Sequence, residues 1–147
     1  MKERRLAREV AMQILFQWEA QGLLERHQKE LPKNLLNVDI ESFISHFWQL
    51  FYNKEHTKLD RDFTSYLLRG SLSSLVQIDS LLDNINAKWK LTRMDALERA
   101  ILRLACFELN SKNLAPAIII NEAVELAKRY GNEQSPQFVN GLLDNIK

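Results

Sequence analysis

The sequence has few of the residues that break or cross-link a chain. Its 147 residues include four glycines, three prolines and one cysteine, Cys106. Phosphate-binding loops, dinucleotide fingerprints and nucleophile elbows all need glycines at fixed spacing, and none of these patterns occurs. A single cysteine excludes an internal disulfide, and the apolar helical pattern around it predicts a buried thiol instead of a nucleophile.

The sequence also has little net charge and no long apolar run. The formal net charge is +1, which excludes a protein that holds nucleic acid by bulk electrostatics alone, so any such binding must be local or shared with a partner. Apolar runs such as residues 114–120 are too short to cross a bilayer. The amphipathic N-terminus contains Glu3 and Glu9, unlike a signal peptide. We therefore expect a cytoplasmic protein without membrane association.

Catalytic and metal-binding patterns are also missing from the sequence. The three histidines, His27, His46 and His56, lie far apart, and no pair has the i, i+4 spacing of a helical zinc site. Glu122 and Glu125 share one helix face, but such carboxylate pairs are usually solvated. We predict no catalytic residue, no metal site and no cofactor, and an enzyme is disfavoured.

What the sequence does have is helical periodicity over most of its length. Strand-like alternation is almost absent, so the pattern predicts one all-α domain. Residues 20–38 are predicted to be a connector, and Gly70 either interrupts a helix or packs closely against a neighbour. Helices are expected over residues 1–18, 39–51, 60–86 (as two helices or one broken helix), 92–109, 118–130 and 135–146.

Residues with special backbone preferences mark the helix boundaries. Asp39 and residues 92–95 are predicted N-terminal caps, and Pro116 suits a first helical turn. Gly131 is predicted to end its helix in the left-handed conformation. Ser135 is then expected to cap the last helix, with the following proline as the first helical residue.

The first eighteen residues combine an apolar arc with a basic flank. Beside the arc, Arg5, Arg8, Met12 and Phe16 project from one side of the helix, with Arg4 at the border. Guanidinium groups bind phosphates, and an exposed ring can stack on an unpaired base, so this flank suits nucleic acid. The alternative is a solvated charged flank with Phe16 buried by another helix. The apolar arc contains Ala7, Val10, Ala11, Ile14, Leu15 and Trp18.

Polar residues interrupt two otherwise apolar helices near the C-terminus. Asn121 and Glu122 interrupt one, and Asn140 with Gly141 interrupts the other. A structural interpretation is a buried amide bonded to backbone and a glycine that allows close helix contact. The functional alternative places Asn140 with Phe138 at a binding surface near a helix N-terminus, whose free amides suit a phosphate.

These features occur within segments that resemble the NusB family of transcription antitermination factors. The matching segments keep the family's order and spacing and cover roughly half of the chain, whereas residues 20–88 match mainly by helical pattern and length. The segments are residues 4–18 (RRLAREVAMQILFQW), 100–109 (AILRLACFEL), Pro116, 120–131 (INEAVELAKRYG) and 135–144 (SPQFVNGLLD).

The resemblance implies an all-α fold of about seven helices, arranged as two packed small bundles without catalytic activity. We place the subdomain boundary near residue 86, giving subdomains of about 1–86 and 87–147. The implied function is an adaptor that binds single-stranded boxA RNA of ribosomal RNA leaders. It would act together with NusE, a small-subunit ribosomal protein, within the RNA polymerase antitermination complex.

The resemblance also implies roles for individual residues. The head of this chain carries less charge than richer family heads, because Leu6 lies between its arginines, and Glu133–Gln134 replaces a more acidic loop of some relatives. The implied RNA-binding residues are Arg4, Arg5, Arg8, Phe16, Phe138 and Asn140, and the implied NusE-docking residues are Glu98 and Arg103.

Two alternatives stay open from the sequence. The chain could be the NusB-like RNA-binding module of a ribosomal RNA cytosine methyltransferase, which requires a cofactor-binding domain beyond Lys147. It could also form a homodimer that buries the basic flank and serves as an inactive store.

Overall fold

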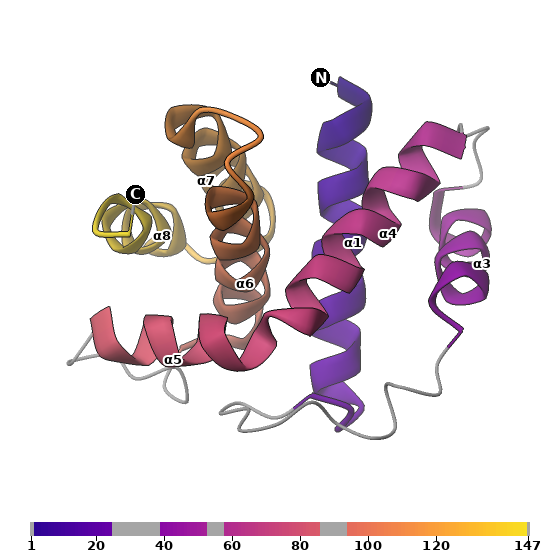
Figure 1. Cartoon of the computed structure of the whole chain (residues 1–147), viewed down its shortest axis with the longest axis horizontal. Helices are drawn as coiled ribbons and strands as arrows, with labels where there is room; N and C mark the ends of the chain where they lie inside the picture. The colour runs from indigo at the N-terminus through magenta and orange to yellow at the C-terminus, as the bar shows by residue number, and fades with distance from the viewer. Residues whose placement is uncertain (1, 25–38, 53–57, 86–93, 147) are drawn as a thin grey trace.

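The computed structural model describes residues 2–24, 39–52, 58–85 and 94–146, and within these ranges the chain forms seven helices and no strands (Figure 1). The all-α prediction is therefore confirmed, whereas most of the predicted connector lies outside the described residues. The helices are α1 (Lys2–Ala20), α3 (Ile40–Tyr52), α4 (Lys58–Ser73), α5 (Leu75–Ile85), α6 (Ala96–Ser111), α7 (Pro116–Tyr130) and α8 (Ser135–Asp144).

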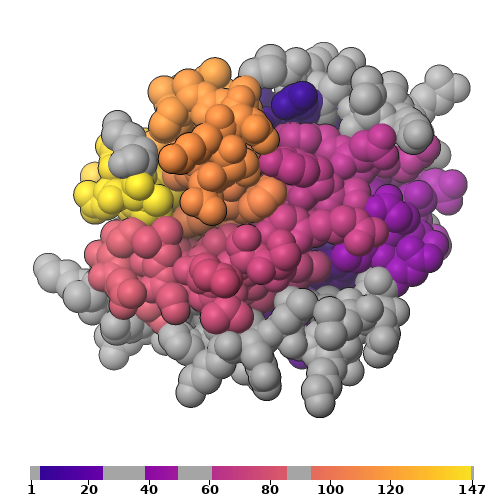
Figure 2. Space-filling model, viewed as in Figure 1, coloured from indigo at the N-terminus to yellow at the C-terminus, as the bar shows by residue number. Residues whose placement is uncertain are grey.

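Helix α1 lies at the centre of the molecule. It packs against α4 and α6, and α3 packs against α4 (Figure 1). In the view of Figure 2, atoms of α4 lie over α1, of which only a small part is visible. Every residue of its predicted apolar arc is at most 1% exposed. This burial is the hydrophobic contribution that holds a helix with so many charged residues inside the fold.

The remaining helices form a second group around α6. Helices α6, α7 and α8 pack against one another, and α5 continues from α4 to pack on α6 (Figure 1). The two groups are joined through contacts of α6 with α1 and α4, and α5 contacts both α4 and α6. The subdomain boundary near residue 86 stays a prediction, because α5, which precedes it, contacts helices of both groups, and residues 86–93 are outside the described ranges.

Three of the expected helix starts match the structure. The Asp39 carboxylate accepts hydrogen bonds from the backbone N–H and the hydroxyl of Ser42 at 3.2 and 2.9 Å. Asp95 begins α6 with a capping box, in which Glu98 accepts a hydrogen bond from the Asp95 N–H at 3.2 Å. Pro116 occupies the first turn of α7, where a backbone N–H would have no partner within the helix, so the lack of an N–H in proline costs nothing.

The expectation for Gly131 is wrong. Its backbone is extended, with φ −90° and ψ −171°, not left-handed. An added Cβ at this position would lie 2.6 Å from the Ser135 Oγ and 2.8 Å from the Ala127 carbonyl oxygen. Glycine is therefore needed for close approach of the chain before α8, and not for a positive φ.

The start of α8 also differs from its prediction. Ser135 is the first residue of the helix instead of its cap, and it is fully buried. The side-chain oxygen of Asn132 accepts hydrogen bonds from the backbone N–H groups of Gln134 and Ser135 at 2.8 and 3.1 Å. The Ser135 hydroxyl instead donates to Glu98 at 2.8 Å, which joins the start of α8 to the start of α6.

Gly70 allows α4 to approach α6 closely, which confirms the second of its two interpretations. A Cβ at Gly70 would lie 1.9 Å from the Phe107 Cζ. Phe107 cannot easily turn away, because its ring also packs against Tyr66 at a centroid distance of 5.2 Å.

We predict that Gly70→Ala lowers the free energy of unfolding by about 2 kcal/mol or more, because the methyl group overpacks a filled site. Gly141→Ala is the matched control, since a Cβ there meets nothing within 4 Å, and it should stabilise α8 by about 0.5–1 kcal/mol. Urea unfolding followed by circular dichroism measures both. Equal effects of the two substitutions would contradict the packing argument.

Candidate nucleic-acid interface

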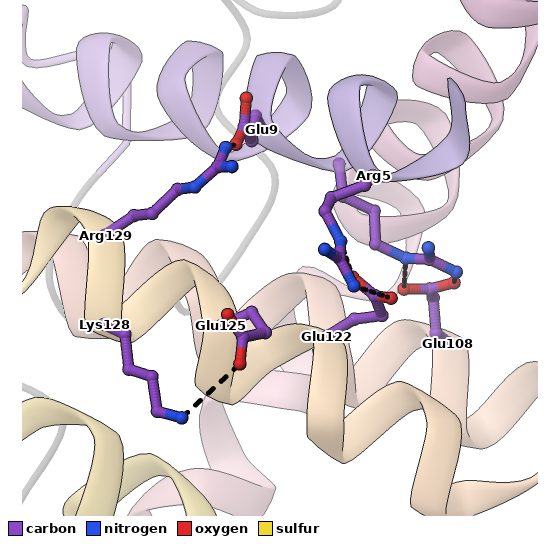
Figure 3. Close-up of polar contacts among 8 residues, drawn as sticks. Arg5, Glu9, Glu108, Glu122, Glu125, Lys128 and Arg129 are labelled. Carbon is purple, nitrogen blue, oxygen red and sulfur yellow. Dashed lines mark hydrogen bonds and ion pairs between the residues drawn. The ribbon is translucent and has the colours of Figure 1, made fainter. Parts of the chain in front are cut away.

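Two arginines near the start of α1, Arg5 and Arg8, are held by carboxylates of other helices. The Arg5 Nε and Nη2 donate to the two carboxylate oxygens of Glu122 on α7, at 3.0 and 3.1 Å (Figure 3). The side chain of Arg5 is 45% exposed and that of Glu122 is 11% exposed. Hydrogen bonding and charge attraction to Glu122 raise the pKa of Arg5 above its ordinary value. Arg5 is therefore a fixed, solvent-facing guanidinium.

Arg8 is buried, unlike the exposed flank expected from the helical wheel. It is 3% exposed, and its Nε and Nη2 donate to Glu108 of α6, both at 2.8 Å. Its Nη1 is buried without a hydrogen-bond partner. Met12, on the same flank, is also fully buried. A helical wheel describes one isolated helix, whereas here α6 and α4 pack against this side of α1.

Arg4 and Phe16 are exposed at the two ends of the expected flank. The Arg4 guanidinium lies 4.8 Å from the centroid of the Phe63 ring, in a cation–π arrangement. Phe16 is 40% exposed, so the alternative in which another helix buries this ring is wrong.

A further ion pair joins α1 to the C-terminal turn of α7. Arg129 of α7 donates to the carboxylate of Glu9 on α1 (Figure 3). Glu9 is almost completely buried, whereas the side chain of Arg129 is 56% exposed. The Arg129 guanidinium therefore presents positive charge at the surface between the two helices.

Phe16 lines a groove of about 430 Å³ between α1, the start of α6 and the end of α7. Tyr130, 39% exposed, contributes a second ring to this groove. Burial, and then the charge of Glu9, raise the pKa of Tyr130, so the phenol is a neutral hydrogen-bonding group. The other lining residues are Met12, Gln13, Asp95, Leu97, Gly131 and Asn132.

A second hollow of about 650 Å³ adjoins the first. Both are lined by Asp95 and Asn132, so together they form one surface that extends from Phe16 on α1 to Phe138 on α8. We call this surface the aromatic groove. Asn140 is exposed on α8 but lines neither hollow. The second hollow is lined by Met94, Asp95, Glu98, Asn132, Gln134, Gln137 and Phe138.

Of the two expected docking residues, Arg103 is buried inside the fold. It is 1% exposed, and its Nε and Nη2 donate to Asp79 of α5, both at 2.9 Å. Its Nη1 lies 3.4 Å from Glu19 of α1, which also accepts two hydrogen bonds from Arg99. Arg103 thus ties α6 to α5 and α1.

Glu98, the other expected docking residue, is half-buried at the edge of the aromatic groove. One carboxylate oxygen serves the capping box of α6 and the other accepts from Ser135. Glu98 therefore holds the starts of α6 and α8 together, and part of its side chain is accessible from the groove.

Sequence reasoning missed several groove residues, among them Tyr130, Asn132 and the neighbouring Arg129. A usable signal was the run Lys128–Arg129–Tyr130 directly before Gly131, because it combines cations with an aromatic ring at a helix end.

The described residues show little that suits other chemistry. Within these ranges, no group of three His, Cys, Asp or Glu side chains is arranged to hold a metal ion. No described helix is long and apolar enough to cross a membrane. Burial raises the pKa of Cys106 to about 12, so its thiol is a packing group.

The comparison with protein families decides the relationship. The NusB family model matches residues 5–147. The chain belongs to the NusB family. It is 36% identical to the transcription antitermination protein NusB of Solibacter usitatus, over all of this chain and 90% of that protein. It is 38% identical to the protein of the same name from Desulfitobacterium hafniense, over 97% of this chain and 86% of that one.

Solved NusB structures share the fold. The structure of T. maritima NusB has a TM-score of 0.76 and 33% identity, over 97% of this chain and 89% of the other. A structure of antitermination factors NusB and NusE in complex with dsRNA has a TM-score of 0.76 and 26% identity, over 99% and 96% of the two chains. The resemblance drawn from the sequence segments is confirmed.

Arg103→Ala should lower the free energy of unfolding by about 3–5 kcal/mol, because it removes the cation that donates two hydrogen bonds to the buried Asp79 carboxylate. The control Arg69→Ala removes an exposed pair with Glu41, with side chains 56% and 54% exposed, and should cost less than about 1 kcal/mol. Denaturant unfolding measures both. A stable Arg103→Ala protein would contradict the structural role assigned to Arg103.

Cys106 should be nearly unreactive toward iodoacetamide at pH 8 in the folded protein. Its raised pKa leaves almost no thiolate at that pH, and its side chain is buried. Mass spectrometry of alkylated protein, with and without denaturant, measures the protection. Rapid alkylation of the folded chain would contradict the burial.

Proposed function

We propose that this chain is a transcription antitermination adaptor that binds single-stranded boxA-type RNA together with NusE and joins the RNA polymerase antitermination complex. The role requires no catalytic step, and it places the protein in the cytoplasm with nascent transcripts. The observation that carries the proposal is the aromatic groove, in which Phe16, Tyr130 and Phe138 lie along one surface next to Arg129.

The groove chemistry fits an unpaired strand. Exposed aromatic rings offer stacking surfaces to bases that a duplex would hide, and phosphates pair with guanidinium groups. Phe16 and Phe138 are proposed to stack bases, and Asn140 to hydrogen-bond the strand where it leaves the groove. Arg4 and Arg5 are proposed to bind phosphates.

Arg8 is assigned a different part in RNA binding. Its guanidinium is buried against Glu108, so it supports the site by fixing α1 against α6 without touching the strand. A direct contact between Arg8 and RNA, as the family resemblance implies, would require the pair with Glu108 to open, which leaves a buried carboxylate uncompensated.

Recruitment of NusE is proposed to use the region around Glu98. Its carboxylate lies at the edge of the second hollow, so a partner can contact it beside the RNA. Arg103 contributes from inside, by holding α6 in place through Asp79 and Glu19. A net charge of +1 agrees with an RNA affinity that is shared between two proteins.

Fluorescence anisotropy with labelled RNA tests the proposal. A boxA-like strand should bind more tightly than a scrambled strand, and NusE should tighten the boxA complex. Phe16→Ala combined with Phe138→Ala should weaken boxA binding by about tenfold or more, because each lost stacking contact costs about 1–3 kcal/mol.

Leu81→Ala is the matched control for these substitutions. Leu81 is 39% exposed, nearly as much as Phe16, but it lies on α5 and lines neither hollow of the aromatic groove. It should leave boxA affinity within about twofold of the unmodified protein. The proposal would be overturned if the control substitution lowered boxA affinity as much as the Phe16 and Phe138 substitutions, or if the protein bound boxA and scrambled RNA equally. Sedimentation at several protein concentrations, measured in parallel, shows whether a variant binds RNA less tightly because it has lost a contact or because α1 is buried in a homodimer.

A further inference from the structure

The positive charge expected at the head of α1 is largely cancelled within the molecule. Arg5 and Arg8 each form a two-bond pair with a carboxylate, and Arg129 at the groove pairs with Glu9. The Arg8 pair is buried, whereas the side chains of Arg5 and Arg129 are 45% and 56% exposed and can meet a ligand. Of these two, Arg5 lies at the head of α1, where Glu122 holds it with two hydrogen bonds (Figure 3).

Glu122 is the polar residue that interrupts the apolar face of α7. It is 8% exposed, and its neighbours Ile119, Ile120 and Ala123 are buried. A carboxylate in such a place requires a cationic partner, because burial of an unpaired charge is costly. Glu122 and Arg5 therefore stay paired, and the pair carries almost no net charge.

The pairing leaves one side of the Arg5 guanidinium for a ligand. Glu122 uses Nε and Nη2, so Nη1 is not engaged by this carboxylate. A phosphate that approaches Nη1 gains a directed hydrogen bond, but it also comes close to the negative charge of Glu122. The attraction is weaker than that of an isolated arginine.

We infer that Glu122 determines RNA selectivity, by cancelling the charge of Arg5 and so weakening its attraction for any phosphate backbone. This inference rests on the proposed function. Backbone attraction is the same for every sequence, whereas contacts with bases differ between sequences. With the backbone contribution reduced, the bases in the aromatic groove decide which strand binds.

The test compares Glu122→Gln with Glu125→Gln. Both substitutions remove one negative charge from α7, and the residues lie one turn apart. Glu125 is 46% exposed and pairs with Lys128 at 3.4 Å, while the two Arg5 hydrogen bonds go to Glu122 (Figure 3). Glutamine at position 122 keeps the shape of the side chain and one hydrogen-bond acceptor for Arg5.

Glu122→Gln should tighten binding of scrambled RNA by about three- to tenfold and of boxA RNA by less, so that the ratio of the two affinities falls. The salt dependence of binding should become steeper. Glu125→Gln should change both quantities less. In an Arg5→Ala background, Glu122→Gln should lose most of its effect. Unchanged or weakened RNA binding by folded Glu122→Gln, or equal effects of the two substitutions, would overturn the inference.

Elution from heparin separates this inference from the proposed function. Heparin is a polyanion without bases, so Glu122→Gln should elute at higher salt than Glu125→Gln whether or not the protein recognises boxA. If the unmodified protein does not distinguish the two RNAs but the heparin shift is present, the proposed function fails and charge cancellation stands. If boxA selectivity is present and the heparin shift is absent, the inference fails alone.

A second comparison applies if Glu122→Gln does not fold. Arg4→Ala and Arg5→Ala both change exposed side chains. The Arg4 guanidinium contacts the Phe63 ring, which carries no charge, whereas the charge of Arg5 is cancelled by Glu122. The loss of Arg4 should therefore flatten the salt dependence of RNA binding more than the loss of Arg5. An equal or larger change for Arg5→Ala would overturn the inference.

Discussion

The position of α1 depends on ion pairs that connect it to the C-terminal helices. Arg8 pairs with Glu108 of α6, and Glu19 accepts hydrogen bonds from Arg99 of the same helix. These charges are buried, so separating either pair would leave a buried charge without its counter-ion, which is costly. Close apolar packing favours one arrangement of the helices, and the paired charges reinforce it because each charge meets its partner in one register only. The aromatic groove is assembled from α1, α6, α7 and α8, so it depends on the position of α1.

Ion pairs also shape the surface that we propose to bind RNA. Arg5 and Arg8 at the head of α1 are placed by carboxylates, so their geometry is fixed before a ligand arrives, but much of their charge is already balanced. We expect a surface of this kind to bind a generic phosphate backbone weakly. Rings such as Phe16 and Tyr130, which are exposed beside it, then contribute a larger share of the affinity.

Much of the fold and part of the site were predictable from the sequence. Helical periodicity gave the helices and the buried arc of α1, and the wheel placed Arg5 and Phe16 at the surface correctly. It failed for Arg8 because it contains no information about the Glu108 that receives this guanidinium. The position of Tyr130 and Asn132 beside Phe16 was not predictable, since they reach α1 only when α7 folds back beside it, although the basic residues before Tyr130 were a usable signal for this helix end. Gly131 was misassigned because a close approach to Ser135, and not a left-handed turn, explains the glycine.

The most direct test of the account is to map where RNA touches the folded protein. A boxA strand carrying photoreactive nucleotides would be cross-linked to the protein with NusE present, and the linked peptides identified by mass spectrometry. The account predicts cross-links to the peptides of α1, of the α7–α8 junction and of α8 that contain Phe16, Tyr130 and Phe138. Cross-links concentrated instead on the face of α4 around Tyr66, with the groove peptides unlabelled, would contradict it.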